Sequence, residues 1–303
     1  MMAHAQTYPG KPIRVIVPFA PGGSTDILAR MVGQKLTEAW GQQVIVENRP
    51  GGGTVIGTDL VAKSAPDGYT LVMTSTSTAT APSLVRKLPY DTLRDLAPVI
   101  RLVSTPNALV VHPSVPARSV RELIALARLR PDQIAFGSGG NGTSTHLGGE
   151  ILRLMAGVRM VHVPYKGAAP SLTALMSGEI SWLFGAILPT LPHIQSGRLR
   201  AIAVSSARRT SALPDVPPVA DTLPGFDTSP WTGVAAPGAT PKDVIARLNQ
   251  EIARGFNAPD IRDRLTREGN DIVANTPEQF EAFFRVEMEK WARVIKEAGI
   301  KLE

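Results

Sequence analysis

Residues 13–26 read IRVIVPFAPGGSTD, and this stretch decides how the rest of the chain is interpreted. Its first five residues form a short run of apolar, mostly β-branched side chains with one charge, which predicts a buried strand. Proline and glycine then end the strand, and apolar residues at helical spacing follow Ser24. The stretch therefore predicts a strand, a glycine-rich turn and the N-terminus of a helix.

A turn of this kind favours an anion. The first N–H groups of a helix have no acceptor within it, and that end carries a partial positive charge. Gly22 and Gly23 have no Cβ atom, so a ligand can approach the backbone closely. Ser24 or Thr25 can cap the helix or offer a hydroxyl to the ligand. An ordinary strand-to-helix turn capped by Ser24 would explain the same residues.

A second stretch repeats the pattern. Residues 134–155 read IAFGSGGNGTSTHLGGEILRLM, with a short apolar strand, a Gly-Gly pair, a cluster of hydroxyls and then a helical apolar pattern. The pairs Gly22-Gly23 and Gly139-Gly140 resemble two copies of one device. We therefore expect one anion-binding turn in each of two domains, facing each other across a cleft.

Composition limits the class of protein. The chain has 303 residues, of which 43% are hydrophobic and 19% charged, as expected for two soluble globular domains. A net charge of +6 would suit nucleic acid, but acidic residues interleave with the basic ones and the 4 Trp and 4 Tyr do not cluster with them. We therefore expect no nucleic-acid partner, and a mildly basic surface that attracts anionic solutes.

Cofactor and metal sites are not expected. The absence of cysteine excludes disulfides and thiolate metal sites, and the five histidines do not pair at a metal-binding spacing. Neither glycine turn has the lysine of a Walker loop, and the GxGxxG dinucleotide motif is absent from the turn at Gly22-Gly23.

His146 follows the second turn, where it could contact a ligand carboxylate or make a structural hydrogen bond. A hydrolase that pairs one of the serines with His146 is an alternative function in the same cleft. The sequence singles out no nucleophile for that reaction, so we expect no catalysis.

The order of elements predicts an α/β fold. Strands over 43–49 and 70–74 and a helix over 54–65 continue the first strand and helix, which predicts a parallel sheet. The hydroxyl run Thr76–Thr78 follows the third strand, at the sheet edge where such folds bind ligands. A first crossover between domains is expected within 99–111, a second βα series within 119–205, and the approach to a second crossover in the proline-rich residues 213–230. Helices over 241–256 and 277–298 follow.

Several motifs then resemble one family, the Bug (TctC-like) extracytoplasmic solute-binding proteins of tripartite tricarboxylate transporters. The resemblance covers nearly the whole chain in the same order. Its motifs are VPFAPGGSTDILAR (17–30), VENRPGGGTVIGT (46–58), APDGYTL (65–71), SGGNGTSTHLGGE (138–150), VPYKG (163–167), LPDVPPVADTLPGF (213–226) and WTGVAAPGATP (231–241).

The resemblance implies a type II periplasmic-binding-protein fold, with two α/β domains joined by two crossovers and a ligand cleft between them. We expect domain 1 to comprise residues 1–106 and 229–303, and domain 2 to comprise residues 107–228. The implied function is capture of a small carboxylate, held mainly by backbone N–H groups, hydroxyls and bridging waters. The implied ligand-binding residues are Phe19, Ala20, Pro21, Gly22, Gly23, Ser24, Thr25, Thr76, Ser77, Thr78, Ser138, Gly139, Gly142, Thr143, Ser144, His146, Tyr165 and Gly185.

One departure bears on the ligand. Many members of the family resemble DLMFDN after the strand near residue 180, where this chain has SWLFGA. Gly185 thus stands where an acid is common, and an acid there could hold a ligand ammonium group. We therefore expect plain mono- or dicarboxylates, aromatic ones included, rather than amino acids.

Location and partners follow from the same resemblance. Ala3-His4-Ala5 matches the A-x-A pattern that ends a secretory signal peptide, so we expect a periplasmic protein whose signal peptide is absent from the printed sequence. The expected partners are the integral-membrane permease subunits of a tripartite tricarboxylate transporter, served by a monomer. A binding protein that reports to a signalling partner is the alternative within the same class.

Overall fold

The structure is a computed structural model that describes residues 8–19, 21–165 and 168–299. The described residues group into two compact units. The first comprises those within Met1–Val103, Trp231–Asp263 and Ile272–Ala292, and the second those within Ser104–Pro230, Arg264–Asp271 and Arg293–Glu303. The chain passes from one unit to the other after Val103, Pro230, Asp263, Asp271 and Ala292.

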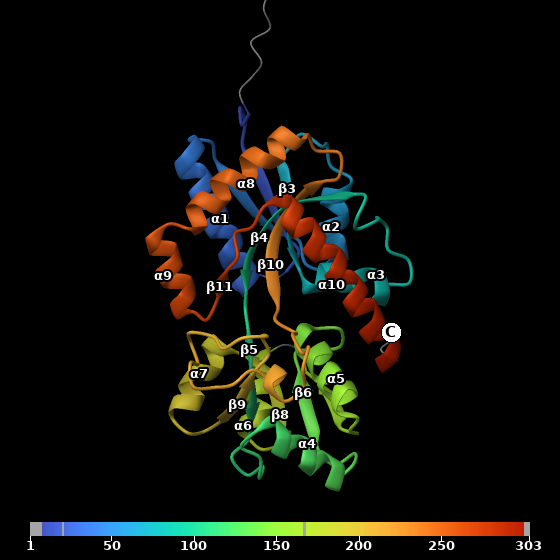
Figure 1. Cartoon of the computed structure of the whole chain (residues 1–303). Coiled ribbons are helices and arrows are strands. Elements are labelled where there is room, and N and C mark those ends of the chain that lie inside the picture. The colour runs from blue at the N-terminus through green and yellow to red at the C-terminus, as the bar shows by residue number, and fades with distance from the viewer. Residues whose placement is uncertain (1–7, 20, 166–167, 300–303) are drawn as a thin grey trace, which may run out of the picture. The chain divides into compact units, whose positions relative to one another are not determined.

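The first unit is built on a mixed sheet with the strand order β11-β4-β10-β3-β1-β2 in the described part of the chain. Figure 1 shows this sheet with α8 beside α1. The elements that lie in it wholly or in part are β1 (Ile13–Val17), α1 (Ser24–Trp40), β2 (Val44–Asn48), a 3₁₀ turn (Gly52–Thr54), α2 (Val55–Ala62), β3 (Thr70–Ser75), α3 (Thr76–Leu84), β4 (Leu96–Ser104), β10 (Trp231–Pro237), α8 (Lys242–Phe256), α9 (Pro259–Arg267), β11 (Asp271–Ile272) and α10 (Pro277–Ala298).

Parallel pairing of β1 with both β2 and β3 confirms the parallel arrangement predicted for residues 13–74. Strand β10 enters the sheet from the proline-rich segment and pairs antiparallel with β3. The core lies where Ile16 and Val72 of the sheet meet Val61 of α2. Helix α10 packs on β10 through aromatic rings, since Trp231 lies 5.5 Å from both Phe280 and Phe284 between ring centroids.

The second unit has its own sheet, with the order β7-β6-β8-β5-β9 among the described residues. Strand β6 is parallel to β7 and β8, whereas β5 is antiparallel to β8 and β9. Its elements are β5 (Asn107–Val111), α4 (Val120–Leu129), β6 (Ala135–Ser138), α5 (Ser144–Ala156), β7 (Val161–Pro164), α6 (Ala168–Met176), β8 (Trp182–Ala186), α7 (Ile187–Gln195), β9 (Arg200–Val204) and a 3₁₀ turn (Val219–Asp221).

Alternation along the strands of the second unit divides its core between two faces. Leu183 packs with Leu175 of α6 and Ile187 of α7 on one face. On the other face α5 lies so close that a Cβ atom on Gly149 would come within 2.2 Å of the Phe136 ring. Glycine at this position of α5 is therefore what lets the helix approach β6.

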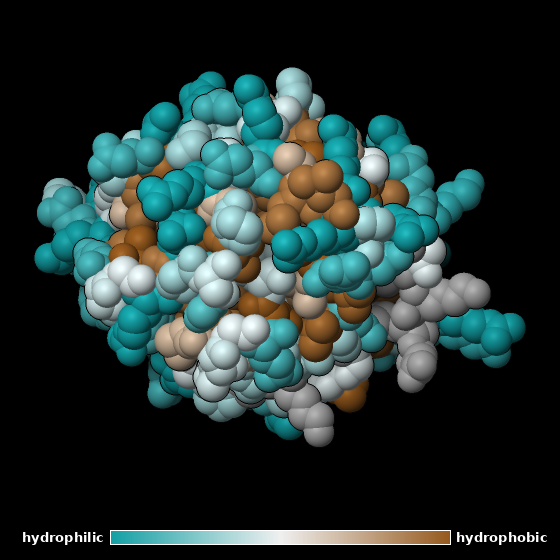
Figure 2. All heavy atoms as spheres, turned by 90° about the horizontal axis from the view of Figure 1, so that it is seen from below, coloured by the Kyte–Doolittle hydropathy of each residue, from teal (hydrophilic) through white to brown (hydrophobic). Residues whose placement is uncertain are grey.

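The surface of the protein carries both hydrophobic and hydrophilic residues. Figure 2 shows one face, on which hydrophobic residues occur in scattered groups among hydrophilic ones. Leu129 is the most exposed of the large hydrophobic residues in the described part, at 81%, and the others are spread over several elements. None of the helices within the described ranges combines the length and the apolar content needed to span a bilayer.

Two helices were missed from the sequence. The hydroxyl run after β3 was expected to end a strand, but it begins α3, because Ser75 and Thr78 form a capping box. The Ser75 side chain accepts from the Ser77 N–H at 3.2 Å, and the Ser75 N–H donates to Thr78 Oγ1 at 3.1 Å. Helix α9 was likewise not expected.

Candidate functional site

The first loop joins β1 to α1. Gly22 has a φ of 87°, a left-handed conformation that glycine adopts without strain, and Gly23 is the N-cap of α1 in an extended conformation. Nothing lies within 4 Å of where a Cβ atom on Gly23 would be, so its backbone is open to approach. Phe19 and Pro21 precede this turn in the chain, and Ala20 lies outside the described residues.

The predicted side-chain cap of α1 is wrong. Neither Ser24 nor Thr25 caps the helix, because its N-cap is Gly23, which has no side chain. The Asp26 carboxylate instead accepts the Gly22 N–H at 3.0 Å. This bond ties the residue before the N-cap to the first turn of α1 and leaves the first N–H groups of the helix without a side-chain cap.

Asp26 is buried, with 3% of its surface exposed. Its carboxylate also accepts from Arg30, at 3.1 Å to each oxygen, and from the Asn48 amide at 2.9 Å. Burial alone would raise the pKa of Asp26, but the hydrogen bonds from Arg30, Gly22 and Asn48 outweigh it and lower the pKa. The first loop therefore holds an ionised carboxylate whose charge is largely offset by Arg30 but which weakens the attraction of this helix end for an anion.

The hydroxyl run lies at the same sheet edge as the first loop, because β1 and β3 are parallel neighbours that both end there. The Thr78 hydroxyl is occupied as an acceptor in the capping box, whereas Ser77 is partly exposed. The buried Thr76 Oγ1 has no hydrogen-bond partner in the part of the chain that the structure describes. A buried hydroxyl without a partner is costly, so Thr76 is suited to bind a ligand or water.

The second loop joins β6 to α5 and is held by its own side chains. Gly140 and Gly142 have φ values of 126° and 75°. Thr143 is the N-cap of α5: its Oγ1 donates to the Gly140 carbonyl at 2.7 Å and accepts from the His146 N–H at 3.4 Å. The Gly139 N–H donates to Thr145 Oγ1 at 3.1 Å.

The serines of this loop differ. The Ser138 hydroxyl is buried and exchanges hydrogen bonds with Gly140, accepting its N–H at 3.1 Å. Ser144 opens α5 and is partly exposed, so its hydroxyl and N–H are better placed to reach a solute than the Ser138 hydroxyl.

His146 is buried, and its Nδ1 accepts the Gly142 N–H at 3.0 Å, so it makes the structural hydrogen bond that was one of its two expected roles. Its ring stacks on His162 with centroids 3.8 Å apart and planes at 14°. His162 Nε2 lies 2.7 Å from Ser138 Oγ. Two histidines separated in sequence thus contact one loop.

Both imidazoles are neutral at neutral pH. Burial and then the positive charge of Arg153 lower the pKa of His146 to about 4. Burial and the neighbouring His146 lower the pKa of His162 to about 4, against the opposing charge of Glu150. Among the described residues, no group of three or more His, Asp or Glu side chains could hold a metal ion.

His162 was missed from the sequence because its position follows from strand pairing. The parallel register of β6 and β7 pairs His162 with Phe136. Along the chain, His162 is sixteen residues away from His146. Spacing rules for metal ligands or catalytic pairs do not detect such a contact. Strand alternation indicates only that His162 lies on the face opposite to Val163, and it does not show that His146 lies on that face.

Tyr165 and Gly185 lie at the carboxyl ends of β7 and β8, beside the second loop. The Tyr165 N–H donates to the Ser138 carbonyl at 3.0 Å, and its hydroxyl donates to Glu179 at 2.7 Å. Burial and the Glu179 carboxylate raise the pKa of Tyr165 to about 12. A Cβ atom on Gly185 would lie 2.6 Å from Thr190 Cγ2, so an acidic side chain has no room there unless Thr190 moves.

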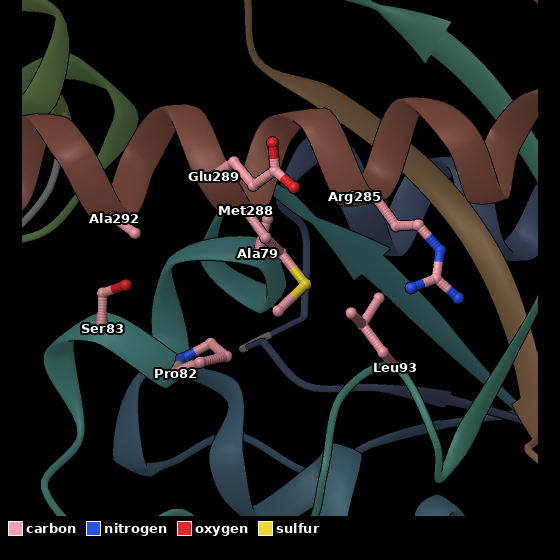
Figure 3. A pocket seen from close by; sticks show the side chains of 8 residues that line it. All are labelled: Ala79, Pro82, Ser83, Leu93, Arg285, Met288, Glu289 and Ala292. Atoms are coloured by element: carbon pink, nitrogen blue, oxygen red, sulfur yellow. The ribbon is translucent and has the colours of Figure 1, made fainter.

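A cavity of about 290 Å³ lies in the first unit, between α3 and α10. Figure 3 shows Met288 of α10 pointing into it toward Pro82 of α3, with Arg285 and Glu289 at its margin. None of the predicted ligand-binding residues lines this cavity. The candidate residues therefore lie elsewhere, in one loop of each unit.

Comparison with known proteins gives a consistent result. The family model described as "Tripartite tricarboxylate transporter family receptor" matches residues 28–300. Protein BugT of Bordetella pertussis is 40% identical over 99% of this chain and 93% of its own length. A protein encoded in the tcbD-tcbE intergenic region of a Pseudomonas strain is 38% identical over 96% of this chain and 87% of its own length.

Solved structures agree. The periplasmic binding protein BugD has a TM-score of 0.81 and 32% identity, covering 97% of this chain and 100% of its own. An R. palustris protein solved with adipate has a TM-score of 0.84 and 34% identity over 97% of this chain and 100% of its own. MatC from Rhodopseudomonas palustris, solved with bound malate, has a TM-score of 0.80 and 29% identity over 95% and 100%.

These findings confirm the expected fold class, and they confirm a solute-binding protein rather than an enzyme. The glycine turns, the mixed α/β sheets and the match over residues 28–300 lead to one conclusion: the chain belongs to the TctC (Bug) family of tripartite tricarboxylate transporter receptors, whose solved members are periplasmic solute-binding proteins.

Proposed function

We propose that this protein captures a small mono- or dicarboxylate in the periplasm and delivers it to the integral-membrane permease of a tripartite tricarboxylate transporter. The observation that carries the proposal is that relatives matching nearly the whole chain were solved with adipate and with malate. Two loops that open helices with glycines supply the donors that a carboxylate needs. The same proposal includes a monomeric protein.

The proposed donors in the first unit are backbone and hydroxyl groups. Asp26 already takes the Gly22 N–H, so the N–H groups of Gly23, Ser24 and Thr25 are the ones available at this helix end. Thr76, whose buried hydroxyl has no partner in the described structure, adds a side-chain donor. Bridging water relieves the opposition between the ligand carboxylate and Asp26 at little cost in affinity.

The proposed donors in the second unit follow by the same reasoning. The Gly139, Gly142 and His146 N–H groups are occupied within the loop. The N–H groups of Ser144 and Thr145 are the first of α5, and the Ser144 hydroxyl joins them. Thr143 and Ser138 then act by shaping the loop.

Selectivity against amino acids follows from Gly185. A ligand ammonium group needs a nearby carboxylate, and here that position has neither an acid nor space for one beside Thr190. The proposed ligands are therefore plain carboxylates, including aromatic ones. A sensing role would use the same binding site with a different partner.

A thermal-shift screen against a panel of carboxylates, amino acids and neutral analogues tests the class of ligand. A ligand present at about 1,000 times its Kd stabilises by roughly 4 kcal/mol, which is a shift of several degrees for a chain of this size. Stabilisation by a carboxylate and not by its amide supports the proposal. Stabilisation by amino acids alone, or turnover of the stabilising compound, would contradict it.

The Gly23→Val variant tests the first loop. The backbone there is extended and the space beside it open, so the fold accepts a side chain that covers the neighbouring N–H groups. We expect loss of carboxylate binding with an unchanged melting temperature, and an intermediate effect for Gly23→Ala. Wild-type affinity in Gly23→Val would remove this loop from the site.

Loss of uptake in a deletion strain distinguishes transport from sensing, in which uptake continues but induction is lost.

A further inference from the structure

The stacked pair of His146 and His162 is the feature that the proposed function leaves unexplained. The pair ends a run of aromatic contacts in the second unit. His162 lies 5.0 Å from Phe136 between ring centroids, and Phe136 lies 5.0 Å from Trp182 in a stacked arrangement. Both Phe136 and Trp182 are fully buried, so the imidazoles rest on a rigid support.

One imidazole is hydrogen-bonded to a glycine of the second loop directly, and the other is linked to a different glycine through a serine hydroxyl. His146 Nδ1 accepts the Gly142 N–H directly. His162 Nε2 contacts the Ser138 hydroxyl, and that hydroxyl accepts the Gly140 N–H. The two rings therefore fix the two left-handed positions of the loop.

The two bonds respond differently to a proton. A backbone N–H can only donate, so the neutral His146 ring carries its proton on Nε2 and accepts at Nδ1. A proton added to Nδ1 would face the Gly142 N–H donor, and the bond would break. At His162 the Ser138 hydroxyl can reverse: it accepts from a protonated Nε2 and donates to the Gly140 carbonyl, which lies 3.2 Å away. Only the His146 bond is incompatible with the charged ring.

The surroundings of the pair do not favour a proton. The charged side chains that face it in the described structure are Glu150 and Arg153 of α5, which are paired with each other at 2.6 Å. Strands β6 and β8 present Ser138, Phe136 and Trp182, which are uncharged. The carboxylate nearest the pair is thus already neutralised, and burial keeps both rings neutral until the solution is acidic.

We propose that His146 is a positioning residue for the ligand loop, and that protonation of its Nδ1 releases the Gly142 N–H and opens the second loop. Opening moves the first N–H groups of α5, so carboxylate binding weakens in acid beyond the effect of protonating the ligand. The effect on binding rests on the proposed function, whereas the effect on the loop does not.

The decisive variants are His146→Asn and His162→Gln. Asparagine offers an oxygen acceptor at the position of Nδ1 that does not titrate in this range, so it keeps the Gly142 bond and removes the switch. His162→Gln keeps a partner for Ser138 and leaves His146 in place. His112→Asn, at a partly exposed histidine beside Ser114, is the matched control.

The first measurement uses ¹⁵N-labelled protein without ligand between pH 7.5 and pH 4. In wild type and in His162→Gln, we expect hydrogen-exchange protection of the Gly142 amide to fall at least about tenfold relative to His146→Asn, the loss of one hydrogen bond. The imidazole spectrum of wild type at pH 7.5 should show the Nε2–H tautomer of His146. The Nδ1–H tautomer, or equal loss of protection in His146→Asn, would overturn the proposal.

The second measurement is the affinity for adipate at pH 7 and pH 3.5. Ligand protonation affects all variants equally, so the ratio of wild-type to His146→Asn affinity isolates the loop. Because the pKa of His146 is about 4, we expect wild type to lose about fourfold more affinity than His146→Asn, and His112→Asn to follow wild type. Equal losses would refute the link to binding. Failure of every variant to bind any carboxylate at pH 7 would instead count against the proposed function, with the amide result still deciding the role of His146.

Discussion

The neutral histidine pair makes a quantitative prediction about stability in acid. In the unfolded chain each histidine has a pKa near 6.5, whereas in the folded protein His146 and His162 have pKa values of about 4. Between these values the unfolded state binds more protons than the folded state. Stability is therefore fully present above pH 6.5 and is lost as the pH falls toward 4.

The size of the loss follows from the two pKa values. Linkage gives about 2 kcal/mol for each histidine between pH 7.5 and pH 5.0, or about 4 kcal/mol for the pair. At roughly 2 °C per kcal/mol for a chain of this size, the melting temperature falls by roughly 8 °C. Paired carboxylates do not contribute to the loss between pH 7.5 and pH 5.0. Hydrogen bonds from arginines are the main cause that lowers the pKa values of Glu47 and Asp95 to about 2, so the stability that these two groups contribute is lost only at lower pH.

Differential scanning calorimetry at constant ionic strength measures this loss in the ligand-free protein. The double variant His146→Asn, His162→Gln carries no titrating group at these positions, so its melting temperature should change by no more than a few degrees over the same range. His112→Asn should follow wild type. A wild-type melting temperature that is constant from pH 7.5 to pH 5.0 would refute the reasoning, as would a double variant with the full wild-type slope.

Three further predictions concern named hydrogen bonds, each checked by urea unfolding. Thr143→Val removes the cap of α5 and should cost about 1 kcal/mol of stability while weakening carboxylate binding; wild-type values for both would contradict its place in the loop. Glu287→Ala leaves the buried indole N–H groups of Trp231 and Trp291 without their shared acceptor, so we expect a loss of roughly 2 to 6 kcal/mol, and a loss below about 1 kcal/mol would count against this bond network. Asp26→Ala should cost roughly 1 to 3 kcal/mol because the first loop loses its acceptor, whereas unchanged stability would show that the loop closes without it.

The strands and long helices could be predicted from the sequence because their signals are local. The apolar run at Ile13–Val17 and the helical spacing after Ser24 both correspond to elements with the expected limits. Helix α3 could not be predicted in this way, since Thr76–Leu84 is rich in threonine and serine and contains a proline. Its start depends on a capping box, which overrides the low helix propensity of those residues.

The loops could be located from the sequence, but the roles of their side chains could not. Glycine pairs mark the turns, yet hydroxyls near a turn can bind a ligand or the turn itself, and the pattern is the same for both. Ser138 and Thr143 illustrate this, because their hydroxyls are occupied by Gly140 and by the start of α5. Which hydroxyl is occupied depends on the exact distances between donor and acceptor atoms in the folded loop, and residue spacing in the sequence does not predict these distances.

The two loops are more alike in structure than in sequence, and their one difference has a consequence for the ligand. In each loop a glycine N–H donates to the side chain four residues later, Gly22 to Asp26 and Gly142 to His146. Asp26 is ionised and paired with Arg30, whereas His146 is neutral, so the same device places an ion pair at one helix end and no charge at the other. Arg30 offsets the Asp26 charge, but the carboxylate lies one turn nearer the helix end than the guanidinium and weakens the attraction of that end for an anion. Within the proposed function, we therefore expect the second loop to be the better direct partner for a carboxylate group, and contacts at the first loop to be made more through water or by the uncharged part of the ligand.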